Sequence, residues 1–235
     1  MNLTELMNEL ESLGSEQTRK TFIRHGAKEP FFGVKIGDLK KFVKHVKKDQ
    51  ELALALYETG NHDAMYLAGL AVDPKKLSKE MLQKWVEDAY WYMLSEYTVA
   101  GVAAESPFAL ELAREWISSD NEMIATAGWG TYANYVTITE DDKLDLNEIR
   151  SYLDHIRHHI HDSPNRVRYD MNQFVIAVGS YVDILYDEAK SVAEAVGKVH
   201  VDVGQTACKV PLATDYIEKV IQRRKPGTKK KTSRC

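Results

Sequence analysis

The stretch SPFALELAREWISSDNEMIATAGWGTYANYV, residues 106–136, contains two helix-forming patterns separated by a very short turn. The first pattern begins with Ser106-Pro107, which is typical of a helix start because serine caps free N–H groups and proline lacks one. Ser119 and Glu122 have the spacing of a capping box. That spacing predicts a second helix starting about two residues after the first helix ends.

Small residues along the second pattern, Gly128 and Gly130 among them, would let another backbone come close. Such a tight hairpin buries only one face by itself, so it needs a neighbouring hairpin on each side, as in a helical solenoid. Ser-Pro recurs at 163–164, and helix pairs recur at roughly 40-residue intervals, the length of HEAT-like repeats. Short alternation is confined to Val199, Val201 and Val203, and one strand cannot make a sheet.

The pattern therefore predicts an all-α fold, a right-handed α-solenoid of HEAT-like repeats. We expect one domain over residues 1–222, followed by a basic tail over residues 223–235. The 235 residues are 44% hydrophobic and 28% charged, which is ordinary for a globular chain. The chain has no run of 18 apolar residues, so we expect no membrane span. An acidic N-terminus and two poorly spaced cysteines argue against a signal peptide and a disulfide framework, which favours the cytoplasm.

The charge is unevenly spread. The whole chain carries a net charge of −4, but the last thirteen residues hold seven cations and no acid, so the preceding residues carry −11. Such a tail is either a solvated, disordered end or an arm that contacts phosphates. The candidate contacts in it are Arg223, Arg224, Lys229, Lys230 and Lys231.

Common catalytic signatures are missing from the sequence. It contains no P-loop, HExxH, GxSxG or CxxC pattern. His155 and His159 have helical i, i+4 spacing and could share one metal face, but no third ligand lies at useful spacing. The alternative is an exposed helix end, where histidine suits the helix dipole. We expect neither a metal nor a cofactor.

The segment 89–97, AYWYMLSEY, is the densest in aromatic residues. Its rings could stack on a nucleobase, or they could pack between repeats. Four large aromatic residues in so short a helix cannot all point inward, so one or two should face a groove. Glu96 lies among them and could act as a base or hold a cation if burial raises its pKa.

A third candidate is SPNRVRYDMN, residues 163–172. Arg166 and Arg168 fall in the first turn of the expected helix, where the dipole disfavours cations. Together with the free N–H groups of that turn they could hold an anion such as a phosphate. Pairing with Asp162 or Asp170 is the alternative.

At these residues the sequence resembles the DNA alkylation repair family, the AlkD-like group of HEAT-like-repeat proteins. The resemblance rests on the order and spacing of GVKIGDLKKFVK, TGNHDAMYLAGLAVD, YWYMLSEYTVA, EWISSDNEMIATAGW and SPNRVRYDMNQFVIAVGSYV. The C-terminal VDVGQTACKVPLATDYIEKV and GTKKKTSRC resemble one branch of that group.

That resemblance implies a solenoid that cradles DNA on a concave face. In the active glycosylases of the family, a Trp, an Asp four residues later and an Arg in a later helix carry out base excision. Trp91 matches the Trp, whereas Ser95 and Thr126 occupy the Asp and Arg positions. Glu96 is one residue away, and on an α-helix it would point about 100° from the Asp position. The resemblance therefore implies a branch that lacks most of the catalytic pattern, with weak or no glycosylase activity.

Three functions follow as hypotheses. The first is a DNA-binding protein that recognises the backbone or structure of DNA, most simply duplex DNA, without metal or membrane. The second is a glycosylase that excises cationic N-alkylated purines, with Glu96 as the one candidate acid, and the third is a protein-binding scaffold. The DNA interface predicted by the first is formed by the tail cations together with Trp91, Glu96, Trp129, Arg166, Arg168 and Asn172.

Overall fold

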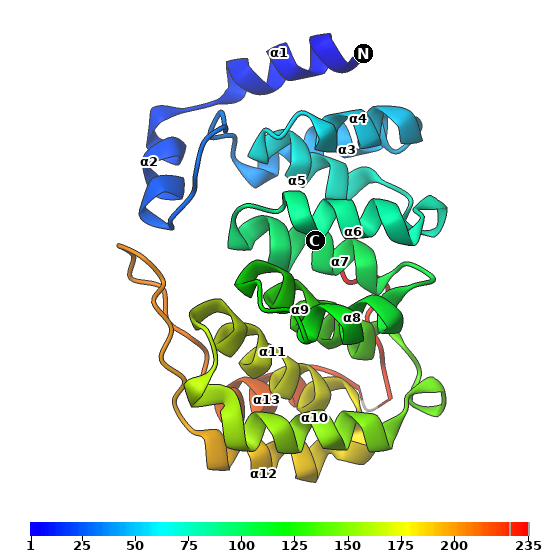
Figure 1. The fold of residues 1–235 in the computed structure, drawn as a ribbon, viewed down its shortest axis with the longest axis vertical. Coiled ribbons are helices and arrows are strands. Elements are labelled where there is room, and N and C mark those ends of the chain that lie inside the picture. Colours follow the sequence, from blue (N-terminus) through cyan, green and yellow to red (C-terminus); the bar gives the residue numbers. More distant parts are fainter. Residues whose placement is uncertain (226, 235) are drawn as a thin grey trace.

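In the computed structural model the described residues, 1–225 and 227–234, form a stack of helices without a strand, so the predicted all-α solenoid is confirmed. Figure 1 shows the stack running from α1 at one end to α12 at the other. Its α-helices are α1 (Leu3–Leu13), α2 (Glu16–Arg24), α3 (Ile36–Val46), α4 (Gln50–Glu58), α5 (His62–Ala71), α6 (Lys79–Asp88), α7 (Ala100–Ala104), α8 (Ala109–Ile117), α9 (Glu122–Ile138), α10 (Leu146–His159), α11 (Asn165–Tyr181), α12 (Tyr186–Val196) and α13 (Ala213–Ile221). A π-helix, η2 (Met93–Val99), precedes α7, and the short 3₁₀ turns are η1 (Pro74–Lys76), η3 (Asp141–Lys143), η4 (Ile160–Asp162) and η5 (Asp183–Leu185).

The helices α5, η2, α9 and α11 form a central row in which each packs on the next. Each has a partner beside it, as α4 has for α5, α8 for α9 and α12 for α11. Two apolar cores result, one gathered around α1 and α3 to α8 and the other around α9 to α13. The row positions the candidate site, because η2, α9 and α11 are three consecutive members of it.

The α8–α9 hairpin shows why small residues matter. A Cβ on Gly128 would lie 2.4 Å from the backbone nitrogen of Ile117, so only glycine lets α9 approach α8 this closely. The predicted hairpin is therefore present, but its capping differs. Asn121, and not Ser119, accepts hydrogen bonds from the first N–H groups of α9, and Ser119 accepts one from the Asn121 N–H instead.

The two Ser-Pro pairs also begin their helices differently from the prediction. Ser106 accepts a hydrogen bond from the Phe108 N–H, and α8 starts after it, at Ala109. Ser163 donates to the His159 carbonyl, and α11 starts at Asn165 without a side-chain cap. In both places Ser-Pro lies in the turn just before the helix and does not cap its first residue.

Residues 198–212 form an extended segment, without the strand considered for Val199 to Val203. It runs along the left side of Figure 1 and reaches α2, where the Gln205 N–H donates to the Arg24 carbonyl. Asn165, at the start of α11, exchanges hydrogen bonds with Asp202. The segment therefore bridges the two ends of the stack on one side of the molecule.

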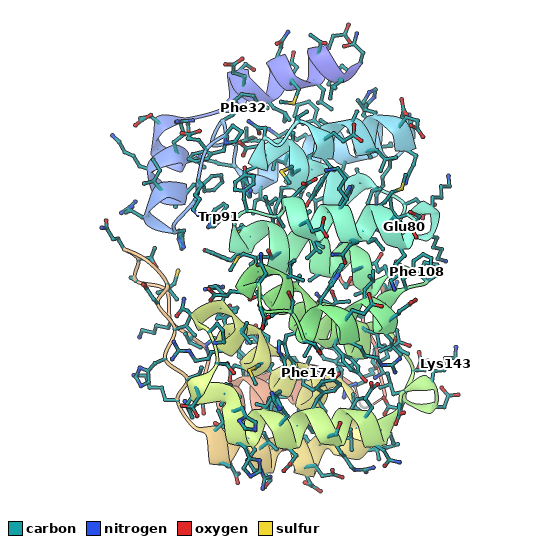
Figure 2. The ribbon with its side chains drawn as sticks, viewed as in Figure 1. Phe32, Glu80, Trp91, Phe108, Lys143 and Phe174 are labelled. Carbon is teal, nitrogen blue, oxygen red and sulfur yellow. The ribbon has the colours of Figure 1, made fainter. Side chains whose placement is uncertain are left out.

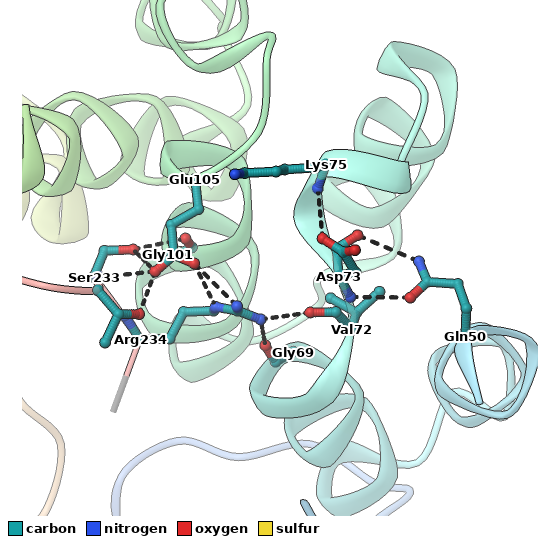
Figure 3. Close-up of polar contacts among 10 residues, drawn as sticks. Gln50, Gly69, Val72, Asp73, Lys75, Gly101, Glu105, Ser233 and Arg234 are labelled. Atoms are coloured by element: carbon teal, nitrogen blue, oxygen red, sulfur yellow. Dashed lines mark hydrogen bonds and ion pairs between the residues drawn. The ribbon is translucent and has the colours of Figure 1, made fainter. Parts of the chain in front are cut away.

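The basic tail after α13 lies against the protein, unlike the solvated, disordered end considered from sequence. The Lys230 N–H donates to the Thr137 carbonyl near the end of α9, and Ser233 and Arg234 bond around Glu105 at the end of α7. Figure 3 shows Arg234 reaching α5, where its Nη1 donates to the Gly69 and Val72 carbonyls. We call residues 228–234 the strap, because they cross the C-terminal ends of the central row from α11 to α5. Pro226 and Cys235 lie outside the described residues.

Candidate functional site

A buried acid–arginine pair joins η2 to α11. The Arg166 guanidinium donates from Nε to Glu96 Oε1 and from Nη2 to Glu96 Oε2, each over 2.6 Å. The side chains are 10% and 2% exposed. Two parallel hydrogen bonds between a planar guanidinium and a carboxylate give a strong, directional pair. The sequence suggested Asp162 or Asp170 as the partner of Arg166, but its partner is Glu96.

Aromatic rings surround this pair. The Arg166 guanidinium carbon lies 4.0 Å from the Tyr92 ring centroid and 4.5 Å from that of Tyr169, both within cation–π range. The Tyr92 hydroxyl is 3.1 Å from His25 Nδ1, which links the pair to the end of α2. Burial raises the pKa of Tyr92 to about 12. The hydroxyl therefore stays protonated and can donate a hydrogen bond.

Asp170 lies one helical turn after Arg166 and is 4% exposed. Its Oδ2 has no hydrogen-bond partner. Burial and the adjacent negative charge of Glu96 raise the pKa of Asp170 well above its usual range. Burial likewise raises the pKa of Glu96, while its two bonds to Arg166 act in the opposite direction. Both buried carboxyls therefore have raised pKa values, and the bonds from Arg166 favour the charged form at Glu96 rather than at Asp170.

The backbone around Glu96 is π-helical, which changes the geometry assumed from sequence. The Ala100 N–H donates to the Ser95 carbonyl, five residues earlier, where an α-helix would bond four residues earlier. A π-helix takes about one more residue per turn, so the rotation of about 100° expected for Glu96 on an α-helix does not apply. Glu96 points into a cavity between η2, α9 and α11, but both its carboxylate oxygens are bound to Arg166.

The positions that the resemblance matches to the catalytic Asp and Arg are fully enclosed. Ser95 and Thr126 are each 0% exposed, and neither hydroxyl has a hydrogen-bond partner. A side chain at either position cannot reach DNA in this conformation.

Three of the residues predicted to line a DNA groove are buried by other parts of the chain. Trp91, on the left in Figure 2, is 4% exposed, and its Nε1 donates to the His25 carbonyl of α2. Trp129 is 2% exposed and packs edge-on against Phe174 in the second core. Asn172 is 1% exposed and donates to the Pro211 carbonyl. The two tryptophan rings and the asparagine amide contact other parts of the protein, so none of the three side chains is exposed to DNA.

The start of α11 is also partly occupied. Glu122 Oε1 accepts a 2.6 Å hydrogen bond from the Arg166 N–H, so a carboxylate of the protein already holds the place predicted for an anion. Arg168 is different, because it is half-buried and has no ion pair among the residues that the structure describes. It lies on the helix face of Asn165 and Asn172, which the segment of residues 198–212 contacts.

The tail cations fall into two groups. Arg224 pairs with Asp183, and Lys229 pairs with Asp141 at 2.7 Å while donating to the Val136 and Tyr181 carbonyls. These two side chains are 8% and 5% exposed, so both are bound within the protein. The remaining candidates, Arg223, Lys230 and Lys231, are exposed.

The histidine candidates lie at the end of α10. The His155 ring stacks 6.1 Å from Trp129 and lies 4.6 Å from the His159 ring. Over residues 1–225 and 227–234, no group of three or more potential ligands is placed to hold a metal ion. Over the same residues, no helix has the length and apolar character needed to cross a membrane.

Sequence reasoning missed several functional candidates. Arg24 and Lys209 are exposed cations beside the junction of α2 with residues 204–208. The position of Arg24 beside residues 205–208 depends on that junction, for which the sequence carried no signal. Asp170 was weighed as a partner of Arg166, but the unpartnered oxygen that makes it interesting appears only in the structure.

Comparisons with known proteins agree with this architecture. The sequence model of a family described as DNA alkylation repair enzyme matches residues 6–197. The uncharacterized protein Lmo0209 of Listeria monocytogenes is 37% identical over 227 residues, which cover 94% of this chain and 98% of that protein. Lin0241 of Listeria innocua, also uncharacterized, is 37% identical over 225 residues, or 93% of this chain and 97% of its own.

A solved structure is similar over the whole chain. It is described as belonging to a new family of proteins related to the HEAT-like repeat DNA glycosylases with affinity for branched DNA structures. The two chains are 39% identical, each is covered completely, and the TM-score is 0.89. The HEAT-like-repeat fold predicted from sequence is therefore confirmed.

Proposed function

From the premise that this chain belongs to the DNA alkylation repair family, we propose that it binds branched DNA through backbone contacts, with weak or no excision of alkylated bases. The observation that carries the proposal is its likeness, at 39% identity over the full length, to a protein of the family with affinity for branched DNA. A DNA ligand supports a cytoplasmic location as part of this proposal, and the composition also favours it.

The surface that supports DNA binding lies where α2, the start of α11 and the bridging segment meet. Arg24 and Lys209 are exposed there, and Arg168 has no carboxylate partner among the described residues. We call these three residues the bridge cations. Phosphate contacts from such side chains would position the protein on a backbone without reading bases, which suits recognition of a DNA shape.

The geometry of Glu96 supports the absence of excision. A glycosylase of this family needs a carboxylate that faces the sugar as positive charge develops on it. Here both oxygens of Glu96 are bound to Arg166 in the interior, and Ser95 and Thr126 are enclosed. The glycosylase alternative therefore has no free acid at the matched positions.

The test is a binding series on a four-way junction and on a linear duplex of equal length, each at several salt concentrations. The wild-type protein should prefer the junction. Reversing one bridge cation, as in Arg24→Glu, Arg168→Glu or Lys209→Glu, should weaken binding and flatten the slope of log affinity against log salt by about 0.9 per lost contact. Arg157→Glu, at an exposed cation on α10, is the matched control. Equal affinity for junction and duplex, or an equal loss in all four variants, would refute the proposal.

In this proposal, only the exposed cations of the tail can contact DNA phosphates. Arg223→Glu and Lys231→Glu should reduce the salt slope if the tail contacts phosphates. Unchanged affinity and slope in both variants would restrict the interface to the bridge cations.

A further inference from the structure

A cavity of about 380 Å³ opens between η2, α9, α11, α13 and the strap. It exists because small residues line it where larger side chains would fill it, namely Gly130, Ala133 and Ala177. A Cβ at Gly130 would lie 3.4 Å from Asp170 Oδ1, which shows how closely α9 borders the acidic end of the space. Its volume is within the range of about 300–1,000 Å³ found for small-molecule sites.

The acidic end of the cavity is formed by Glu96 and Asp170, which are 5% and 4% exposed. The Arg166 guanidinium donates to both carboxylate oxygens of Glu96, so it does not also form an ion pair with Asp170. Asp170 Oδ2 is a buried oxygen without a hydrogen-bond partner, although the Asp170 carboxyl also interacts with that of Glu96. A buried polar atom of this kind costs free energy unless a ligand or another group satisfies it.

The walls of the same cavity are rich in tyrosine. Tyr97, Tyr169, Tyr181 and Tyr216 all line it. Tyrosine faces attract ammonium groups, and one such contact is already present, since Lys230 Nζ of the strap lies 5.0 Å from the Tyr181 ring centroid. Tyrosine rings and a carboxyl oxygen without a hydrogen-bond partner, lining the same cavity, favour a cation over an anion.

We propose that this cavity binds a small aliphatic ammonium compound, such as a diamine or polyamine, with one ammonium group taking the place of the Asp170 proton and the methylene chain along the tyrosine rings. The proposal is independent of DNA binding by the bridge cations. The Lys230 ammonium at the mouth repels the ligand and so lowers the affinity of the intact protein.

The experiment is titration calorimetry of the full-length protein with putrescine and spermidine. We expect one binding site per chain, with binding weakened at least tenfold in Asp170→Asn and strengthened in Lys230→Met. Asp170→Asn keeps the shape of the side chain and should fold, because the raised pKa already keeps Asp170 protonated in the empty cavity. Asp120→Asn removes an exposed carboxylate outside the cavity and is the matched control.

A second variant keeps the test decisive if Asp170→Asn is unstable. Gln173→Trp fills the cavity from a half-buried position and should abolish both binding and the rise of melting temperature that the ligand produces. Absence of binding to the wild-type protein would overturn the proposal. Equal affinity in Asp170→Asn, Gln173→Trp and Asp120→Asn would also overturn it, and would show only general attraction of polyamines to the acidic body.

Discussion

Glu96 and Arg166 are 70 positions apart in the sequence, yet they form a bidentate ion pair in the interior, with both N–O distances at 2.6 Å. The pair connects the π-helix of the central row to α11. The pair also affects the adjacent cavity, because the Arg166 guanidinium is bound to Glu96 and does not form an ion pair with Asp170.

Removing one partner of this pair should destabilise the protein strongly. Arg166→Met leaves the buried Glu96 carboxyl without its cation, for which the expected loss in the free energy of unfolding is about 3–5 kcal/mol. Replacing both residues with methionine should cost less than the worse single change, since no charge is left unpaired. Urea denaturation of the two single variants and the double variant measures this. A double variant as unstable as the sum of the singles would contradict the pairing.

The strap should stabilise the stack. Arg234→Ala removes the donors to Gly69 and Val72 and leaves Glu105 unpaired, so we expect a loss of about 1–3 kcal/mol. In a chain of this size that lowers the melting temperature by roughly 2–4 °C per kcal/mol. Lys231→Ala, at an exposed neighbour, is the control and should change little. Equal melting temperatures for both variants and the wild type would mean that the strap carries no stability.

His62 should make stability depend on pH. It is 2% exposed, and burial lowers its pKa from 6.5 to about 3. The unfolded chain binds a proton below pH 6.5 that the folded chain does not, so stability falls as pH decreases from 6.5 towards 3. The loss should be about 1.4 kcal/mol per pH unit in that window. Urea denaturation of wild type and His62→Phe between pH 7 and about pH 5 isolates the effect. A stability difference between the two that does not change with pH would refute it.

Excision of 3- or 7-methylpurines should be undetectable or very weak. Losing one well-placed electrostatic partner costs about 10²–10³ in rate, and here the matched Asp and Arg positions hold Ser95 and Thr126. Because both are 0% exposed, Ser95→Asp and Thr126→Arg should fail to restore activity and should destabilise the fold. A single-turnover assay of base release with excess protein tests this. Robust release by the wild type, abolished in Glu96→Gln, would show that Glu96 leaves Arg166 and acts as the acid.

The sequence by itself determined the helices and their order. α1 spans an apolar repeat and ends before Gly14, and α10 begins after the capping residue Asp145, because spacing and capping act over a few residues. The repeat length and the ordered motifs likewise sufficed for the solenoid fold and the family. The sequence did not determine the capping residue of every helix, since Asn121 caps α9 where Ser119 was predicted to do so.

Only the tertiary structure decided which side chains meet. The contact of Glu96 with Arg166 depends on how η2 stacks against α11, and its direction depends on a π-helix that apolar spacing does not indicate. Trp129 looked like a groove residue because its neighbours are small, but those small residues let other helices close over it. The basic composition of the tail gave no sign that it packs against the protein. In the structure its cations form ion pairs with Asp141, Asp183 and Glu105. Local patterns specify helices because helical contacts are a few residues apart, whereas the site is formed by residues that only the stacking of distant repeats brings together.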